Sequence, residues 1–122
     1  MPDRSTEEFQ LEASSARTGT TAVNTTAYDV SRYTEGAILL SVTAGGGSSP
    51  TLTLKLYTKS ADGNMWYLHS TLVSALSINT ATATPLYIAY PITNFGEIIR
   101  IEHQMGGSSP TGTYEIRGVF KN

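Results

Sequence analysis

The alternation of apolar and polar residues is the main regularity of this sequence. From residue 21 onward, segments of about five to eight residues place an apolar side chain at every second position, which is typical of β-strands with one buried face. No segment shows the 3.6-residue repeat and capping residues of an amphipathic helix. We therefore expect seven or eight strands, with these inward-facing sets: Val23, Tyr28 and Val30; Ile38, Leu40 and Val42; Leu52, Leu54 and Leu56; Trp66, Leu68 and Leu72; Leu86, Ile88 and Tyr90; Ile99 and Ile101; Tyr114 and Ile116.

Clusters of glycine, serine, asparagine, aspartate and proline separate these segments and predict the turns between strands. They lie at residues 45–50, 62–64, 91–96 and 106–110. Asp62 and Gly63 predict a tight hairpin, because both residues accept the positive φ angle of such a turn. Many short strands without helices predict a single all-β domain, an antiparallel β-sandwich of jelly-roll or immunoglobulin-like topology.

One six-residue motif occurs twice in the chain. Gly46–Thr51 and Gly106–Thr111 both read Gly-Gly-Ser-Ser-Pro-Thr, and each copy follows an aliphatic segment. Proline has a fixed φ angle and no N–H group, so it is tolerated at the first residue of a strand. The repeat predicts two similar hairpins that use the same turn, with a duplicated ligand-binding loop as the alternative interpretation.

The first 20 residues differ from the rest of the chain. They are charged or small and polar, apart from a strand-like segment at Phe9–Ala13. Such a stretch buries too little apolar surface to order itself, so we expect residues 1–20 to be a flexible N-terminal arm and residues 21–122 the sandwich domain. We expect the Phe9 segment to add to a sheet edge, of its own domain or of a neighbouring subunit, with Phe9 and Leu11 as partner-binding residues.

Composition narrows the classes of function. The chain has 122 residues, of which 15% are charged and none is cysteine, so disulfides, thiolate nucleophiles and cysteine metal sites are excluded. A net charge of −2 provides no basic surface for nucleic acid. No apolar run approaches the roughly 18 residues of a membrane span, and the acidic start lacks the features of a secretory signal. We expect a soluble protein, made in the host cytoplasm, that binds neither nucleic acid nor membrane.

The residues do not assemble into a catalytic, metal-binding or cofactor-binding motif. The two histidines, His69 and His103, lie outside any recognisable catalytic triad, so we expect them at surface or interface positions. The carboxylates fall on turns or outward-facing strand positions rather than as a pair for glycoside cleavage, and the glycine-rich segments lack the lysine of a phosphate loop. The sequence therefore predicts a protein that is not an enzyme and needs no cofactor or metal.

Charged residues alternate on the last two predicted strands. Arg100 and Glu102 lie on the first of them, and Glu115 and Arg117 lie on the second. If these two strands pair with each other, the opposite charges would form cross-strand ion pairs, which contribute only a few tenths of a kcal/mol each. We therefore expect these charges to have a structural role.

Aromatic residues are the remaining candidates for a binding surface. Tyr57, Tyr67 and Tyr87 fall on the strand faces opposite their leucine neighbours, so we expect them to point outward and to contact a partner or a surface glycan. Tyrosine also suits half-exposed strand positions for purely structural reasons, which is the alternative interpretation. We expect Trp66 to be a core or edge anchor.

Two passages resemble small β-sandwich virion proteins of tailed bacteriophages. They run from Gly36 to Leu68 and from Phe95 to the C-terminus. In both cases a glycine-serine-proline loop leads into a strand; a Ser-x-Asp-Gly hairpin also precedes the tryptophan strand, and an aromatic-glycine turn precedes the Ile-Arg-Ile strand. The resemblance covers residues 36–122 and leaves the arm unmatched.

This resemblance implies a structural virion protein, a capsid decoration or head accessory protein that stabilises contacts between capsomers on the virion. It implies the major capsid protein or other virion subunits as partners. Exposed sheet edges with few charges also favour a homo-oligomer, for which we expect a trimer. A carbohydrate-binding module and a tail or baseplate subunit stay open as alternatives.

Overall fold

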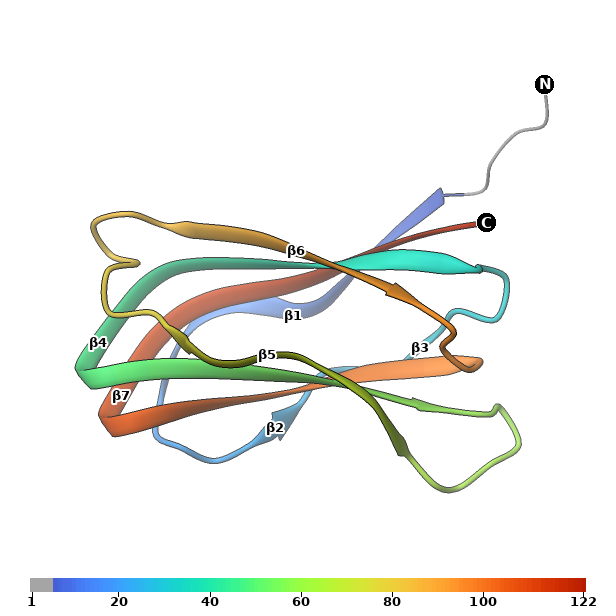
Figure 1. Cartoon of the computed structure of the whole chain (residues 1–122), viewed down its shortest axis with the longest axis horizontal. Helices are drawn as coiled ribbons and strands as arrows, with labels where there is room; N and C mark the ends of the chain where they lie inside the picture. Colours follow the sequence, from blue (N-terminus) through green and yellow to red (C-terminus); the bar gives the residue numbers. More distant parts are fainter. Residues whose placement is uncertain (1–5) are drawn as a thin grey trace.

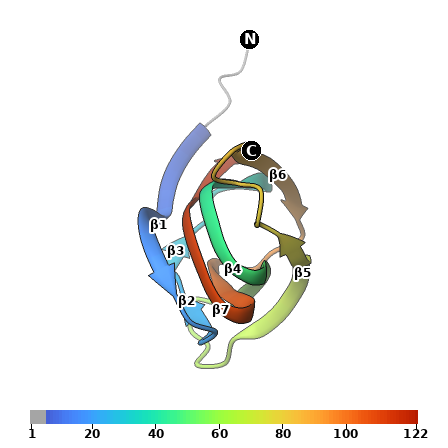
Figure 2. The same ribbon diagram turned by 90° about the vertical axis from the view of Figure 1, so that its left-hand side faces the viewer.

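Two long strands organise the fold. In the computed structural model, which describes residues 6–122, β4 (Glu35–Lys59) and β7 (Ile98–Lys121) have 25 and 24 residues and run antiparallel along their whole length. Figure 1 shows both strands folded over at the same end of the molecule. Each strand therefore contributes one half to each of two sheet layers, which Figure 2 shows end-on.

Five shorter strands complete the two layers. They are β1 (Thr6–Thr18), β2 (Val23–Asn24), β3 (Tyr28–Asp29), β5 (Tyr67–Ser77) and β6 (Leu86–Thr93). One layer has the order β1, the C-terminal half of β7, the N-terminal half of β4, and β6. The other has β2 with β3, the N-terminal half of β7, the C-terminal half of β4, and β5. This antiparallel order is that of a jelly roll, so the all-β sandwich expected from the sequence is confirmed.

The repeated motif forms the fold-over of β4 and β7. Its two copies pair with each other, Ser48 opposite Ser108, so they are related by an approximate two-fold axis. Gly47 and Gly107 occupy equivalent positions with φ angles of +97° and +104°, and the second serine of each copy also has a positive φ, 51° and 47°. The expectation of two hairpins was wrong, because the two halves of each long strand lie in different layers and pair with the other long strand instead of with each other (Figure 1).

Another predicted turn differs in length. Asp62 and Gly63 lie in the connection between β4 and β5, which spans residues 60–66 and is held by a hydrogen bond from the Gly63 N–H to the Ser60 carbonyl. The expected two-residue hairpin is therefore a seven-residue loop, since β4 ends at Lys59 and β5 begins only at Tyr67. This loop leaves room for Trp66 to lie beside the strands instead of within one.

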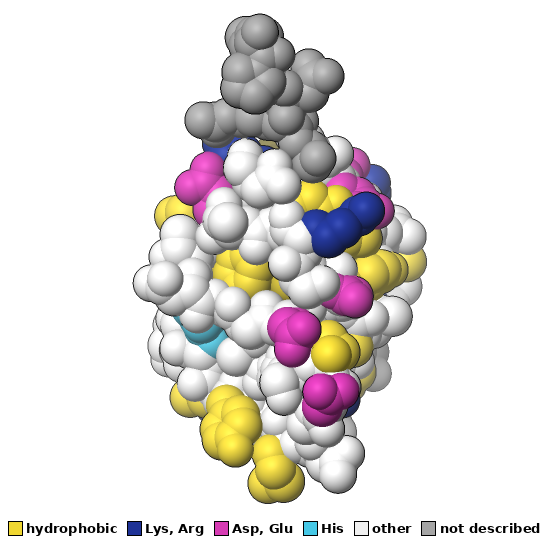
Figure 3. Space-filling view, turned by 90° about the vertical axis from the view of Figure 1, so that its right-hand side faces the viewer, with side chains coloured by type: hydrophobic (Ala, Val, Ile, Leu, Met, Phe, Trp, Pro, Cys, Tyr) yellow, Lys and Arg dark blue, Asp and Glu magenta, His cyan; other side chains and the backbone are white. Residues whose placement is uncertain are grey.

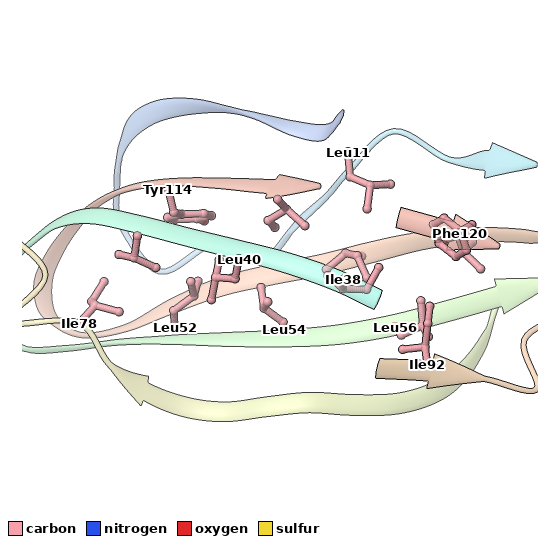
Figure 4. Close-up of a cluster of buried hydrophobic side chains, with 14 of the residues drawn as sticks. Leu11, Ile38, Leu40, Leu52, Leu54, Leu56, Ile78, Ile92, Tyr114 and Phe120 are labelled. Atoms are coloured by element: carbon pink, nitrogen blue, oxygen red, sulfur yellow. The ribbon is translucent and has the colours of Figure 1, made fainter. Parts of the chain in front are cut away.

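The core lies between the two layers and follows the predicted alternation on β4 and β7. Every residue of the inward-facing sets that we predicted on these two strands is at most 2% exposed. The described residues contain no helix long and apolar enough to cross a membrane. Figure 4 shows the core side chains meeting between the layers, among them Leu11, Ile38, Leu40, Leu52, Leu54, Leu56, Ile78, Ile92, Tyr114 and Phe120.

β5 departs from the predicted alternation. We expected Leu68 to face inward, but it is 53% exposed. Leu56 on β4 lies opposite Ser70, whereas the next residue, Tyr57, lies opposite Leu68, so His69 is an extra residue in β5. Such a bulge shifts the strand by one residue and turns the following side chains to the other face. Leu68 therefore lies beside Tyr57 on the outer face of the layer.

The structure also places part of the expected arm inside the sandwich. We expected residues 1–20 to lie outside a domain of residues 21–122, but Thr6–Thr18 form β1 and pair with β7 from Lys121 back to Thr111. The physical reason is that the C-terminal half of β7 pairs with β4 on one side only, so its other edge accepts a strand. Residues 1–5 lie outside the described residues, and the mobility of the arm stays a prediction.

Phe9 and Leu11 are the side chains that attach β1 to the core. Leu11 is 2% exposed. Phe9 is half-buried, and its ring centroid lies 4.7 Å from that of Tyr28 and 5.7 Å from that of Phe120. The expected addition of this segment to a sheet edge is therefore seen within its own domain.

Candidate functional site

A row of side chains crosses the outer face of the layer that contains β5. Tyr57 on β4 lies opposite Arg100 on β7 and opposite Leu68 on β5, so these three side chains share one face. Trp66, the last residue before β5, and Lys59, the last residue of β4, lie at the end of this row. We call these five residues the aromatic–cation patch.

Cations and aromatic rings are in close contact within this patch. The Arg100 Cζ atom lies 4.3 Å from the ring centroid of Trp66 and 5.9 Å from that of Tyr57, and the Lys59 Nζ atom lies 5.3 Å from the Trp66 centroid. A cation over an aromatic face is attracted by the ring quadrupole. Because two aromatic rings contact it, the Arg100 guanidinium is held in place although its residue is only half-buried.

Arg100 has no polar partner among the described residues. Its Nε atom is buried without a hydrogen bond. The other arginines of residues 6–122 each contact a glutamate, Arg17 with Glu12 and Arg117 with Glu8 among them, and Arg100 has no such contact. A buried donor without a partner is unusual in folded proteins and needs an explanation.

Exposed apolar side chains border the patch. Met65 is 65% exposed and Tyr67 is 66% exposed, and both are neighbours of Trp66 in the chain. Figure 3 views the end of the molecule where this loop lies and shows a surface that is mostly polar and uncharged, with separate hydrophobic and charged groups. Large exposed apolar side chains that lie together are typical of interaction surfaces.

The structure does not gather the predicted partner-binding residues into one surface. Tyr67 and Tyr87 are 66% and 71% exposed, but they lie on β5 and β6 in different layers. Tyr57 is half-buried beside Arg100. Phe9 and Leu11 pack within the domain. A role of these five residues in partner binding stays a prediction.

Sequence reasoning missed the role of Arg100 and Trp66. We assigned Arg100 to cross-strand ion pairs between the last two strands, but those strands are the two halves of β7, which lie in different layers and do not pair with each other. Arg117 instead contacts Glu8 at 2.8 Å and Glu115 at 3.3 Å. The sequence could have indicated only that Lys59 and Trp66 lie close together, because one loop connects them. Arg100 comes from a strand about 40 residues further along the chain, so its place beside Trp66 could not be predicted.

A second polar cluster lies between β1 and β7. His103 is 1% exposed, its Nδ1 atom lies 2.6 Å from the Tyr114 hydroxyl, and its Nε2 atom lies 3.3 Å from a Glu12 carboxylate oxygen. A carboxylate only accepts hydrogen bonds, so Nε2 donates to Glu12 and Nδ1 accepts from the Tyr114 hydroxyl. Arg17 completes the cluster, 4.3 Å from the Tyr114 ring centroid and 3.0 Å from Glu12.

Burial controls the protonation of this cluster. It lowers the pKa of His103 below its ordinary value of 6.5, and the nearby Glu12 carboxylate only partly opposes that effect. Burial also raises the pKa of Tyr114 to about 12. Both side chains are therefore neutral near pH 7, and His103 has almost no exposed surface through which a substrate could reach it. The expectation that His103 lies at a surface or interface was wrong, because β1 covers it.

The outer face of the other layer contains a cavity. It has a volume of about 340 Å³, lies between β4, β6 and β7, and is bordered by an ion pair of 3.4 Å between Lys121 and Glu35. Its remaining lining is largely aliphatic, with Thr93 as its one hydroxyl side chain and no histidine. Within residues 6–122, no group of three or more histidine, aspartate or glutamate residues is placed to hold a metal ion.

Comparisons with known proteins identify the fold and not a family. No protein family matches the sequence, and no curated protein is similar to it. VP2 of infectious bursal disease virus, solved as a subviral particle, matches with a TM-score of 0.71 and 9% identity over 97% of this chain. The structure of the Gx strain of the same virus matches with a TM-score of 0.70 and 10% identity over 98% of this chain. The chain spans only about a third of each virus protein, 32% and 33%.

Two smaller proteins match over nearly their whole length. The SPBc2 prophage-derived protein YomS has a TM-score of 0.55 and 14% identity, with 100% of this chain and 97% of that protein covered. The CBM22-1 xylan-binding domain from Paenibacillus barcinonensis has a TM-score of 0.52 and 10% identity, with coverages of 93% and 92%. At such identities the likeness concerns the fold alone, which occurs both in viral proteins and in a carbohydrate-binding domain.

Proposed function

We propose that the chain is a structural virion protein, and more narrowly a capsid decoration protein that stabilises the head of a tailed phage. The observation that carries this proposal is the jelly roll itself, which matches the virus protein VP2 and a prophage-derived protein over 97% or more of the chain. Its partners would be the major capsid protein or other virion subunits, and its location would be the virion surface.

The architecture suits such a role. A protein on a shell needs rigidity without disulfides, and here β4 and β7 pair over their full length while the His103 cluster ties β1 to β7. His103 and Tyr114, whose pKa values are shifted by burial, lie inside the sandwich, so they serve the fold and leave the outer faces for contacts with neighbours.

We expect the protein to associate with itself, as a trimer. β1, β5 and β6 are edge strands, and unpaired edges in a chain with few charges favour pairing with another subunit. Light scattering of the purified full chain at tens of micromolar checks this expectation. A monomer at all concentrations would contradict it and would leave the shell as the partner to test.

A carbohydrate-binding module is the second candidate. The likeness to a xylan-binding domain, at a TM-score of 0.52, and the exposed rings of Tyr67 and Tyr87 support it. Stacking of a sugar on an aromatic ring needs an accessible ring face, and these two tyrosines offer one. Because Tyr67 and Tyr87 lie in different layers, each ring would contact a different sugar chain or a different part of one.

The test requires the major capsid protein encoded in the same genome, and it mixes the full chain with shells assembled from that protein. We expect saturable co-sedimentation with assembled shells, no binding to unassembled shell subunits, and shells that withstand higher temperatures once coated. Absence of shell binding, together with retention of the monomer on a xylan column, would favour the carbohydrate-binding function instead.

A further inference from the structure

Arg100 is a cation beside two aromatic rings, and no anion from the described part of the chain accompanies it. The Trp66 ring lies 4.3 Å from its Cζ atom, and the Tyr57 ring lies 5.9 Å away on the neighbouring strand. No carboxylate of the described residues forms an ion pair with it, and its Nε atom is buried without a hydrogen bond. The rings therefore orient the guanidinium, while no residue within 6–122 accepts a hydrogen bond from its N–H groups.

A guanidinium that is oriented but has no acceptor for its N–H groups is suited to bind one kind of anion. Its planar set of N–H donors matches the two oxygens of a carboxylate, which accept parallel hydrogen bonds. Prior orientation by the rings reduces the side-chain entropy that binding would otherwise cost. Lys59, whose Nζ atom lies 5.3 Å from the Trp66 centroid and which contacts the Gly63 carbonyl at 3.3 Å, adds a second positive charge beside the site.

The surroundings of Arg100 favour a protein over a saccharide. Tryptophan, tyrosine, arginine and methionine are the residue types enriched in the centres of protein interfaces. Here Tyr57, Trp66 and Arg100 are bordered by the flexible apolar side chains of Met65 and Leu68, which are 65% and 53% exposed. Such side chains adapt to apolar protein surface, whereas they offer no stacking face to a sugar ring.

We propose that the aromatic–cation patch docks a partner protein through a glutamate or aspartate, whose carboxylate binds Arg100 while flanking apolar side chains cover Met65 and Leu68. The choice of a protein as the partner rests on the proposed function, in which the chain binds a shell. The docking chemistry rests on the geometry of Arg100 alone.

The first experiment uses the fluorescence of Trp66, the single tryptophan of the chain. The probe is the blocked peptide acetyl-Thr-Val-Glu-Leu-Thr-amide, with glutamine in place of glutamate in a matched control. We expect the glutamate peptide to change the fluorescence saturably and to bind at least tenfold more tightly than the glutamine peptide. Added salt should weaken the glutamate peptide selectively.

Two variants of Arg100 test whether this residue causes the preference for the glutamate peptide over the glutamine peptide. Arg100→Gln should abolish the difference between the two peptides, and Arg100→Lys, which keeps the charge but loses the planar donor set, should retain only part of it. Arg117→Gln removes an arginine from the same strand that already contacts Glu8 and Glu115, and it should leave the difference unchanged. Thermal unfolding of each variant checks that it is folded.

Three results would overturn the proposal. The first is equal binding of both peptides to the natural chain, and the second is an equal effect of Arg100→Gln and Arg117→Gln. The third is a saturable response to polygalacturonate with none to the glutamate peptide, which would assign the patch to acidic saccharides.

Shell binding separates this proposal from the proposed function. If the natural chain binds shells and Arg100→Gln binds at least tenfold more weakly, both proposals are supported. If Arg100→Gln binds shells as well as the natural chain does, the docking site is wrong and the function stands. If the natural chain does not bind shells, the function is wrong, and the peptide titration by itself decides the docking site.

Discussion

His103 illustrates how burial changes the chemistry of a single residue. In the sequence it follows an Ile-Glu pair on an alternating strand, and nothing marks it as buried. In the structure it is enclosed by Glu12 and Arg17 of β1 and by Tyr114 of β7, with Glu102 as its neighbour in the chain. The neutral imidazole accepts a hydrogen bond from Tyr114 and donates one to Glu12. Protonation of His103 would therefore remove the hydrogen bond from Tyr114 and place a second cation near Arg17.

We therefore expect the free energy of unfolding to fall as the pH is lowered below about 6.5. The pKa of His103 is lowered in the folded state, so the unfolded chain takes up a proton first and stability is lost until the folded pKa is passed. One group limits the slope to about 1.4 kcal/mol per pH unit. Urea unfolding at several pH values between about pH 7.5 and pH 5 measures how the free energy of unfolding changes with pH. His103→Gln should reduce the slope, and a slope that stays unchanged in this variant would contradict the assignment.

The backbone at the fold-over is a second feature of residue scale. Gly47 has a φ angle of +97°, and a Cβ atom there would lie 2.5 Å from the Ser109 carbonyl oxygen and 3.0 Å from the Cα atom of Pro110. Gly19 has a similar φ of +89°, but nothing lies within 4 Å of such a Cβ atom. An alanine at Gly19 would therefore report the cost of the positive φ angle alone, whereas an alanine at Gly47 would add the cost of a steric clash with the neighbouring strand.

We expect Gly19→Ala to destabilise the protein by about 1–2 kcal/mol, the usual cost of a left-handed backbone for an L-residue. Gly47→Ala should cost about 3–4 kcal/mol, because the two strands must also move apart at the fold-over. Chemical unfolding of both variants provides the comparison. Similar costs at the two positions would show that the fold-over adapts without strain.

At the scale of elements, β1 is an edge strand that completes the core. Leu11 is 2% exposed, and β1 also covers His103 through Glu12 and Arg17. Its pairing with β7 has register shifts on both sides of Glu12, so the ladder is interrupted where the polar cluster lies. The attachment of β1 therefore depends on its side chains as well as on its backbone hydrogen bonds.

We expect Leu11→Ala to reduce the free energy of unfolding by about 2–5 kcal/mol, as is usual for a fully buried leucine. Leu68→Ala, at a leucine that is 53% exposed, is the matched control and should change stability by no more than about 0.5 kcal/mol. Deletion of residues 1–14 should be more severe than Leu11→Ala, because it also uncovers His103. A deletion variant that is as stable as the full chain would show that β1 is a dispensable arm.

At the scale of the whole molecule, the fold joins residues that are far apart in the chain. Glu35 pairs with Lys121 on one side of the sheet, and Thr6 pairs with the same residue on the other side. Closing such long loops costs entropy before the contacts form, and all-β proteins of this kind fold slowly.

We expect refolding on a timescale of milliseconds to seconds, measured by Trp66 fluorescence in a stopped-flow instrument. Far-ultraviolet circular dichroism of the folded protein should show a β spectrum with little helix. A helical fraction above roughly a fifth, or folding within microseconds, would be inconsistent with this topology.

The sequence was sufficient for the parts of the fold that depend on local pattern. The alternating sets on β4 and β7 identified their buried residues, because one face of a strand must be apolar wherever a layer covers it. It was insufficient for Leu68, since the bulge at His69, one of three register shifts between β4 and β5, inverts the alternation there. It was also insufficient for the repeated motif, since a bend and a hairpin use the same small residues.

What the sequence determined by itself is therefore the all-β class, the core faces of the long strands and the absence of cysteine chemistry. The tertiary structure alone decided the jelly-roll order, the burial of His103 beneath β1, and the meeting of Arg100 with Trp66 and Tyr57. The reason is the same in each case, because alternation specifies which way a side chain points, whereas strand pairing across 40 or more residues specifies what it meets.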